Sequence, residues 1–189
     1  MITSFSNPRV KQVVQWQTRA KERKKDDIFL AEGIKMYEEA PEDSVREVYI
    51  MEETLKKLQQ DSVLKLKLKR TGYETVSTEV FQKMSDTQTP QGILTVLKRP
   101  KYQLEELLKV ENPLFVLLED LQDPGNLGTI VRTGEGAGVT AVIMSRNTVD
   151  IYNPKTIRAT MGSVYRVPFL YVDSMEDTIK SLHNAGVST

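Results

Sequence analysis

One stretch near the middle of the chain, residues 115–138, limits most strongly what this chain can fold into. It opens with a continuous apolar run, Phe115–Leu118, which predicts a strand buried on both faces of a parallel sheet. A polar, turn-forming loop follows, and then a helix that we expect to begin at an N-cap residue, Asn126. Ligands bind open α/β sheets where strands end and helices begin, because unpaired N–H groups point there. The stretch therefore predicts an α/β fold with a ligand site after this strand.

The predicted helix has one apolar side and one outward-facing cation. At about 100° per residue, the apolar side carries Leu127, Ile130, Val131, Gly134 and Gly138. The two glycines let that side lie close to the sheet. Arg132 points about 140° away from the centre of this side, so we expect it to reach a cleft or a partner subunit. Glu135, three residues further on, is placed to hold Arg132 by an ion pair.

Two segments of the chain resemble the SpoU-type RNA 2′-O-ribose methyltransferases of the SPOUT superfamily. The first is Asp123–Thr133, with the sequence DPGNLGTIVRT, which is similar to the first motif of that family. The second is Asn153–Ser163, NPKTIRATMGS, which resembles the segment that those enzymes carry two elements later. The first motif is long and irregular, and both occur in the family's order, a combination that chance rarely produces.

The resemblance implies an enzyme that transfers a methyl group from S-adenosylmethionine to a ribose 2′-hydroxyl of ribosomal or transfer RNA. It implies catalytic roles for Arg132 and Asn126. Arg132 would polarise the hydroxyl or bind an adjacent phosphate. Asn126 would orient the loop or the ribose, unless it is only the helix cap. The resemblance also implies a homodimer in the intact protein.

The family's two remaining motifs are not found in this sequence. They are a glycine-rich turn with a glutamate and a Ser-Leu-Asn stretch, and in the family they form a deep trefoil knot that holds S-adenosylmethionine. We therefore expect a small N-terminal α/β substrate-binding domain followed by the first half of a SPOUT-type parallel-sheet catalytic domain, truncated before the trefoil knot. The cofactor-binding residues are expected beyond Thr189, so this chain alone is expected to bind the cofactor weakly or not at all and to be inactive.

The charged, proline-containing segment Lys98–Glu111 suits a linker between two domains. We place an N-terminal RNA substrate-binding domain at residues 1–107 and an incomplete SpoU-type methyltransferase domain at residues 108–189. Alternation and apolar runs predict strands at 28–30, 45–50, 93–97, 115–118, 140–144 and 167–172. Capping residues predict helices that begin after Asn7, Ser77, Asn153 and Ser174.

The first 25 residues are strongly basic, although the whole chain has a net charge of zero. An RNA backbone would bind such a surface, and the resemblance favours this interpretation. A solvated helix face is the alternative. The residues that we predict to bind RNA are Arg9, Lys11, Arg19, Lys21, Arg23 and Lys24.

Residues 63–69 alternate leucine with lysine and so predict a strand with one charged face. Its lysines would either contact phosphates or protect a sheet edge from aggregation, and we favour edge protection.

Several classes of protein are excluded or disfavoured. The absence of cysteine excludes disulfides and thiolate metal sites, and a single histidine makes structural zinc improbable, so we predict no metal. No apolar stretch is long enough for a membrane span, and the first residues lack the pattern of a signal peptide, which favours a cytoplasmic protein. A non-catalytic RNA-binding module is the alternative to the enzyme.

Overall fold

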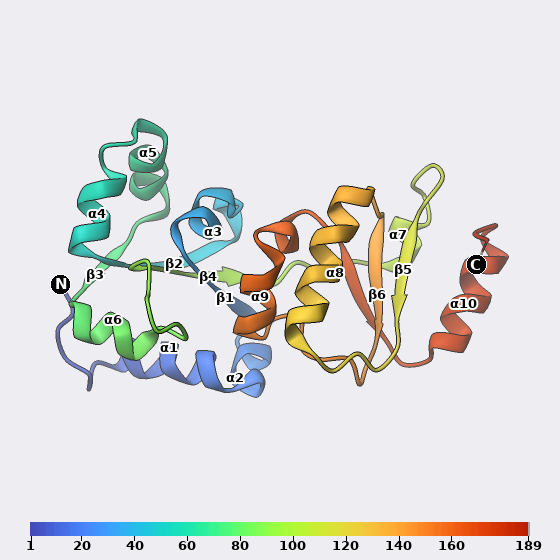
Figure 1. The fold of residues 1–189 in the computed structure, drawn as a ribbon, viewed down its shortest axis with the longest axis horizontal. Coiled ribbons are helices and arrows are strands. Elements are labelled where there is room, and N and C mark those ends of the chain that lie inside the picture. The colour runs from blue at the N-terminus through green and yellow to red at the C-terminus, as the bar shows by residue number, and fades with distance from the viewer. Residues whose placement is uncertain (189) are drawn as a thin grey trace. The chain divides into compact units, whose positions relative to one another are not determined.

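The computed structural model describes residues 1–188 and divides the chain into two compact units, Met1–Pro100 and Lys101–Thr189 (Figure 1). Each unit contains its own β-sheet, which confirms the predicted α/β class. The segment around Tyr102 packs with the second unit, because the centroid of its ring lies 5.6 Å from that of Phe169.

The first unit is built on a four-stranded sheet with the strand order β1-β4-β2-β3. The strands are β1 Ile28–Glu32, β2 Val45–Met51, β3 Glu74–Val76 and β4 Ile93–Lys98. β1 and β2 each run antiparallel to β4, whereas β3 runs parallel to β2. β3 has no counterpart in the sequence prediction, since its 3 residues are too few to show a periodic pattern.

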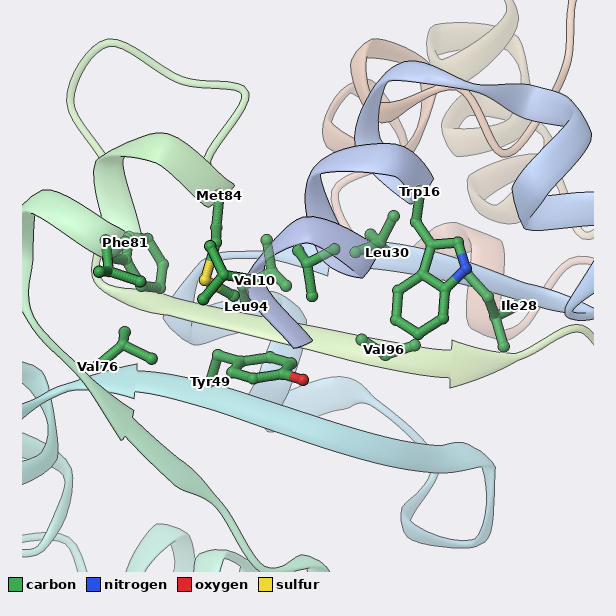
Figure 2. Close-up of a cluster of buried hydrophobic side chains, with 12 residues drawn as sticks. Val10, Trp16, Ile28, Leu30, Tyr49, Val76, Phe81, Met84, Leu94 and Val96 are labelled. Atoms are coloured by element: carbon green, nitrogen blue, oxygen red, sulfur yellow. The ribbon is translucent and has the colours of Figure 1, made fainter. Parts of the chain in front are cut away.

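Helices cover both faces of this sheet. They are α1 Pro8–Thr18, α2 Ala20–Lys25, α3 Ile34–Glu39, α4 Glu52–Leu58, α5 Ser62–Thr71 and α6 Thr78–Met84, with a short 3-10 helix at Glu42–Ser44. Successive side chains of a strand point to opposite faces. Tyr49 of β2 therefore joins the cluster beneath α1 and α6, whereas Val48 and Ile50 join the cluster beneath α3, α4 and α5. Figure 2 shows the first cluster, where Phe81 and Met84 pack over the sheet.

The strand predicted for residues 63–69 is wrong, because these residues lie within helix α5. Asp61 begins the helix by accepting two N–H groups of its first turn, at 2.8 and 3.0 Å. Leu64 and Leu68, four residues apart, are buried on the same side of the helix, while Leu66 between them is 49% exposed. The alternation of leucine and lysine therefore does not mark a sheet edge, and the edge-protection explanation of the lysines no longer applies.

The second unit is built on three parallel strands in the order β5-β6-β7. The strands are β5 Phe115–Leu118, β6 Ala141–Ser145 and β7 Phe169–Val172, and the helices are α7 Leu104–Leu107, α8 Pro124–Ala137, α9 Pro154–Thr160 and α10 Met175–Asn184, with a 3-10 helix at Ser163–Tyr165. The central strand β6 is buried. Full burial of β5 was predicted and is wrong: its four residues are only half-buried, because β5 has a single neighbouring strand among the described residues.

Helices α8 and α9 approach each other closely at Gly128. A Cβ atom at this position would lie 2.5 Å from the Cβ of Ala159 and 2.7 Å from the backbone oxygen of Thr156. The predicted close contact of Gly138 with the sheet is wrong, since this residue ends α8 in the left-handed conformation at φ 72°. Gly134, the other glycine of the prediction, is buried, and a Cβ atom there would lie 2.9 Å from Val139 Cγ2. The glycine that permits the close packing of α8 on α9 is Gly128.

Candidate functional site

The loops at the carboxyl end of the three-stranded sheet are joined by hydrogen bonds within the chain. The Ser145 hydroxyl donates to Asp120 Oδ1 at 2.8 Å and accepts the Asp120 N–H at 2.9 Å. The Gln122 amide donates to the carbonyl oxygens of Asp120 and Asn147, each at 2.9 Å. These bonds connect the loop after β5 with the loop after β6. They therefore fix the position of the loop that leads into α8.

Helix α8 begins at Asp123 and not at Asn126. The Oδ1 atom of Asp123 accepts the N–H of Asn126 at 2.7 Å, and Pro124 occupies the first helical position. The predicted cap at Asn126 is therefore wrong, although the pairing of Asp123 with Pro124 is an ordinary start signal that the sequence contains. The side chain of Asn126 is exposed, and it forms no hydrogen bond within residues 1–188. A role as helix cap alone is excluded, and a role in orienting the ribose stays a prediction.

Arg132 is exposed on α8, as predicted from its rotation about the helix axis. In the part of the chain that the structure describes, its guanidinium has neither an ion pair nor a hydrogen bond. It lies on a ridge of exposed residues spaced three apart, together with Asn126 and Thr129. An exposed guanidinium offers several N–H donors to an incoming anion in a fixed, fork-shaped geometry.

Glu135 does not hold Arg132 as we predicted. Its carboxylate accepts a hydrogen bond from the Ser163 hydroxyl at 2.5 Å and forms an ion pair with Arg166. These contacts tie the last turn of α8 to the 3-10 helix that follows α9. They leave Arg132 without an intramolecular partner. No local pattern predicts this contact, because Glu135 and Arg166 lie 31 residues apart.

The predicted RNA-binding residues of the first unit divide into three groups. The prediction that Arg23 binds RNA is wrong. Its side chain is only 3% exposed, and its Nη1 atom donates to the backbone oxygen of Trp16 at 2.7 Å. This bond helps to end α1, so Arg23 has a structural role. Arg9 is exposed but is paired with Glu74, which balances its charge. The other four predicted residues, Lys11, Arg19, Lys21 and Lys24, are exposed and have no ion-pair or hydrogen-bond partner within residues 1–188.

The described residues offer neither a metal site nor a membrane span. No group of histidine, aspartate and glutamate side chains there could hold a metal ion. Within the same residues, every helix is too short or too polar to cross a bilayer.

Two family models match this chain, one in each unit. The model described as "MRM3-like substrate binding domain" matches residues 7–95, and the model described as "SpoU rRNA Methylase family" matches residues 113–189.

Individual proteins with rRNA methyltransferase names are also similar to this chain. The chain is 34% identical to the Bacillus subtilis 23S rRNA (guanosine(2553)-2′-O)-methyltransferase RlmP over 185 residues, which cover 93% of this chain and 68% of that protein. It is 38% identical to the human mitochondrial rRNA methyltransferase 3 over 112 residues, which cover 55% of this chain and 26% of that protein. The AdoMet-bound rRNA methyltransferase from Sinorhizobium meliloti superimposes with a TM-score of 0.81 at 27% identity, over 97% of this chain and 68% of that one.

Proposed function

Because this chain belongs to the SpoU rRNA methylase family, we propose that it serves the transfer of a methyl group to a ribose 2′-hydroxyl of ribosomal or transfer RNA. The B. subtilis relative bears the name of a 2′-O-methyltransferase acting on 23S rRNA. The methyl donor is S-adenosylmethionine, which is bound in the S. meliloti enzyme. The single observation that carries the proposal is the exposed guanidinium of Arg132 on α8, which has no ion-pair or hydrogen-bond partner within residues 1–188.

The chemistry requires that a poor nucleophile be activated. A ribose hydroxyl must be aligned with the methyl group, and the negative charge that develops on its oxygen must be stabilised. Arg132 suits charge stabilisation and not proton removal, because an arginine side chain stays protonated in proteins. Its N–H groups would donate to the developing oxyanion or to the adjacent phosphate. Asn126 would orient the ribose through its free amide.

Several polar groups at the carboxyl end of the sheet already have partners within residues 1–188. Asp120, Gln122 and Ser145 bond to one another or to nearby backbone. The Tyr171 hydroxyl likewise donates to the Val149 carbonyl at 2.7 Å. The location of the cofactor-binding residues beyond Thr189 stays a prediction.

We assign the binding of RNA to the first unit and the reaction to the second. The order is that of the domains predicted at residues 1–107 and 108–189, although the first unit ends at Pro100. The family match of residues 7–95 to a substrate-binding domain supports this division. Within the first unit, the candidates for phosphate contacts are Lys11, Arg19, Lys21 and Lys24, which are exposed on or near α1 and α2.

The test of this proposal is to substitute Arg132 in the enzyme that carries this chain. We expect Arg132→Ala to lower the rate of 2′-O-methylation by about 100-fold or more, as the loss of one charge-stabilising donor does in other enzymes. Affinity for S-adenosylmethionine and the melting temperature should stay unchanged, because this exposed side chain forms no ion pair or hydrogen bond within residues 1–188. The product is measured as resistance of the RNA to alkaline cleavage, which requires a free 2′-hydroxyl.

A matched control removes a different exposed cation of the same unit. Lys180→Ala, on α10, breaks only surface pairs with Glu176 and Asp177 and should leave methylation unchanged. Methylation at the original rate in the Arg132→Ala enzyme would contradict the proposed role.

A non-catalytic RNA-binding module is the second candidate, favoured by the match of residues 7–95 to a substrate-binding domain. It would bind RNA but would yield no methylated product in the same assay. The homodimer and the cytoplasmic location also stay proposals, and sedimentation equilibrium would test the homodimer.

A further inference from the structure

The lysines of α5 have two distinct environments. Lys67 is buried, and its ammonium group donates to the backbone oxygens of Glu38 and Ala40 at 2.9 and 2.5 Å, at the end of α3. Lys65 and Lys69 are exposed, and within residues 1–188 neither forms an ion pair or a hydrogen bond. Because they are four residues apart, they lie on the same side of the helix.

Lys65 and Lys69 line a surface hollow of about 470 Å³, together with Leu66 and Tyr73. Tyr73 is 40% exposed and Leu66 is 49% exposed, so the hollow has an aromatic ring and an apolar floor open to solvent. No acidic residue is among the described residues that line it. Its size lies within the range of pockets that hold small organic ligands, and a nucleotide is such a ligand.

A neighbouring hollow in the same unit has a balanced charge. It measures about 260 Å³, and Arg9 and Arg46 line it together with Glu47 and Glu74. Arg9 is paired with Glu74, and Arg46 Nε lies 3.9 Å from a carboxylate oxygen of Glu47. Glutamates therefore balance the arginines of this smaller hollow, whereas no acidic residue lines the α5 hollow to balance its lysines.

We propose that the α5 hollow binds single-stranded RNA, with a base stacked on Tyr73 and backbone phosphates at Lys65 and Lys69. This inference rests on the proposed function, which makes RNA the substrate. Single strands are bound in general by a positive surface that follows the backbone and by aromatic side chains that stack on bases. An apolar protein partner would bury two ammonium groups without a counter-charge, which is costly, so the chemistry of the hollow favours a nucleic acid.

Lys65 and Lys69 belong to a different helix layer from Lys11, Arg19, Lys21 and Lys24, although Tyr73 also lines the smaller hollow beside Arg9. α1 packs on one face of the four-stranded sheet, and α5 packs on the other (Figure 1). Substitutions on α5 and substitutions on α1 and α2 should therefore lower RNA affinity independently of each other.

The experiment measures how the complete 189-residue chain binds a short, fluorescein-labelled single-stranded RNA of mixed sequence, by fluorescence anisotropy over a series of KCl concentrations. The double variant Lys65→Gln with Lys69→Gln should weaken binding by about tenfold. It should also reduce the slope of log affinity against log salt by about 1.4, since each phosphate contact on a single strand contributes about 0.7. Tyr73→Leu should weaken binding by about fivefold or more, whereas Tyr73→Phe keeps the ring and should bind as the original chain does.

The control removes the same charge from the adjacent helix. Lys56→Gln with Lys57→Gln acts on exposed lysines of α4 that are already paired with Glu52 and Glu53, and it should leave affinity and salt slope nearly unchanged. Equal effects of the two double variants would overturn the α5 inference.

Three other outcomes are informative. If the α5 variants bind RNA as the original chain does, the inference is wrong while the proposed function stands. If the original chain binds no RNA, the RNA-binding role of the first unit fails as well. If the α5 variants alter self-association in sedimentation but not RNA binding, the hollow is a protein contact and the inference is again overturned.

Discussion

Replacing Gly128 by alanine tests whether the packing of α8 on α9 depends on the absence of one side chain. Two effects oppose each other. Alanine favours a helix interior over glycine by about 1 kcal/mol. Against this, the new methyl group would lie 2.5 Å from the Cβ of Ala159 and 2.7 Å from the backbone oxygen of Thr156. Neither atom belongs to a flexible side chain, so the helices must separate.

The cost of that separation outweighs the gain in helix propensity. Adding a methyl group to a well-packed contact lowers stability by about 1–3 kcal/mol. We expect the upper end here, because the neighbouring atoms are a Cβ atom and a backbone oxygen. With a cost of about 3 kcal/mol and a gain of about 1 kcal/mol, Gly128→Ala should destabilise the second unit by about 2 kcal/mol. A difference of this size is about a 30-fold change in an equilibrium constant.

Hydrogen exchange of the backbone amides of β6 is the direct assay, because this buried central strand should open only when the second unit unfolds. We expect about 30-fold faster exchange there in Gly128→Ala, and no change in the strands of the first unit.

Gly136→Ala is the matched control within the same helix. A Cβ atom at Gly136 would meet nothing within 4 Å, so alanine there changes only the helix propensity, which it improves. Amide exchange in β6 should therefore become slower. If Gly128→Ala also slows exchange, the contact with α9 is more adaptable than we argue and the reasoning is refuted.

Two further predictions concern the first unit. Lys67→Met should lower the free energy of unfolding by about 1–3 kcal/mol, because the buried carbonyl of Ala40 and the partly buried carbonyl of Glu38 lose their donor. Urea unfolding followed by the fluorescence of the single tryptophan measures this, and the exposed Lys65→Met serves as the control that should change little. Arg19→Ala with Lys24→Ala should weaken RNA binding and reduce its salt dependence in anisotropy titrations; an unchanged salt slope would count against the basic surface of α1 and α2.

The parts of the fold that could be predicted from the sequence are those that depend on residues close together along the chain. The side chains of Asn7, Ser77, Asn153 and Ser174 each accept an N–H group within the next three residues, as predicted. Such caps are local, so the sequence around them is sufficient to identify them. The three parallel strands of the second unit were likewise evident from short apolar runs separated by helix signals.

The parts that could not be predicted depend on contacts between distant residues. Arg23 looks like any other cation in a basic segment, and only the folded chain places it against the backbone at Trp16 and Gln17. Glu135 lies three residues after Arg132, yet its carboxylate pairs with Arg166. A local rule left Arg23 at the surface and gave Glu135 its nearest cation, whereas packing supplied the backbone for Arg23 and Arg166 for Glu135.

The position of Arg132 connects stability with the proposed reaction. Gly128 precedes it by four residues, so both lie on nearly the same side of α8, one turn apart. The contact that brings α9 within reach of Gly128 therefore determines where the guanidinium emerges from the helix surface. Glu135, in turn, is held by Ser163 and Arg166, so it neither pairs with nor neutralises the cation. One side of α8 is thus immobilised immediately before and after Arg132 while its charge stays available, which is the arrangement that stabilisation of a developing oxyanion requires.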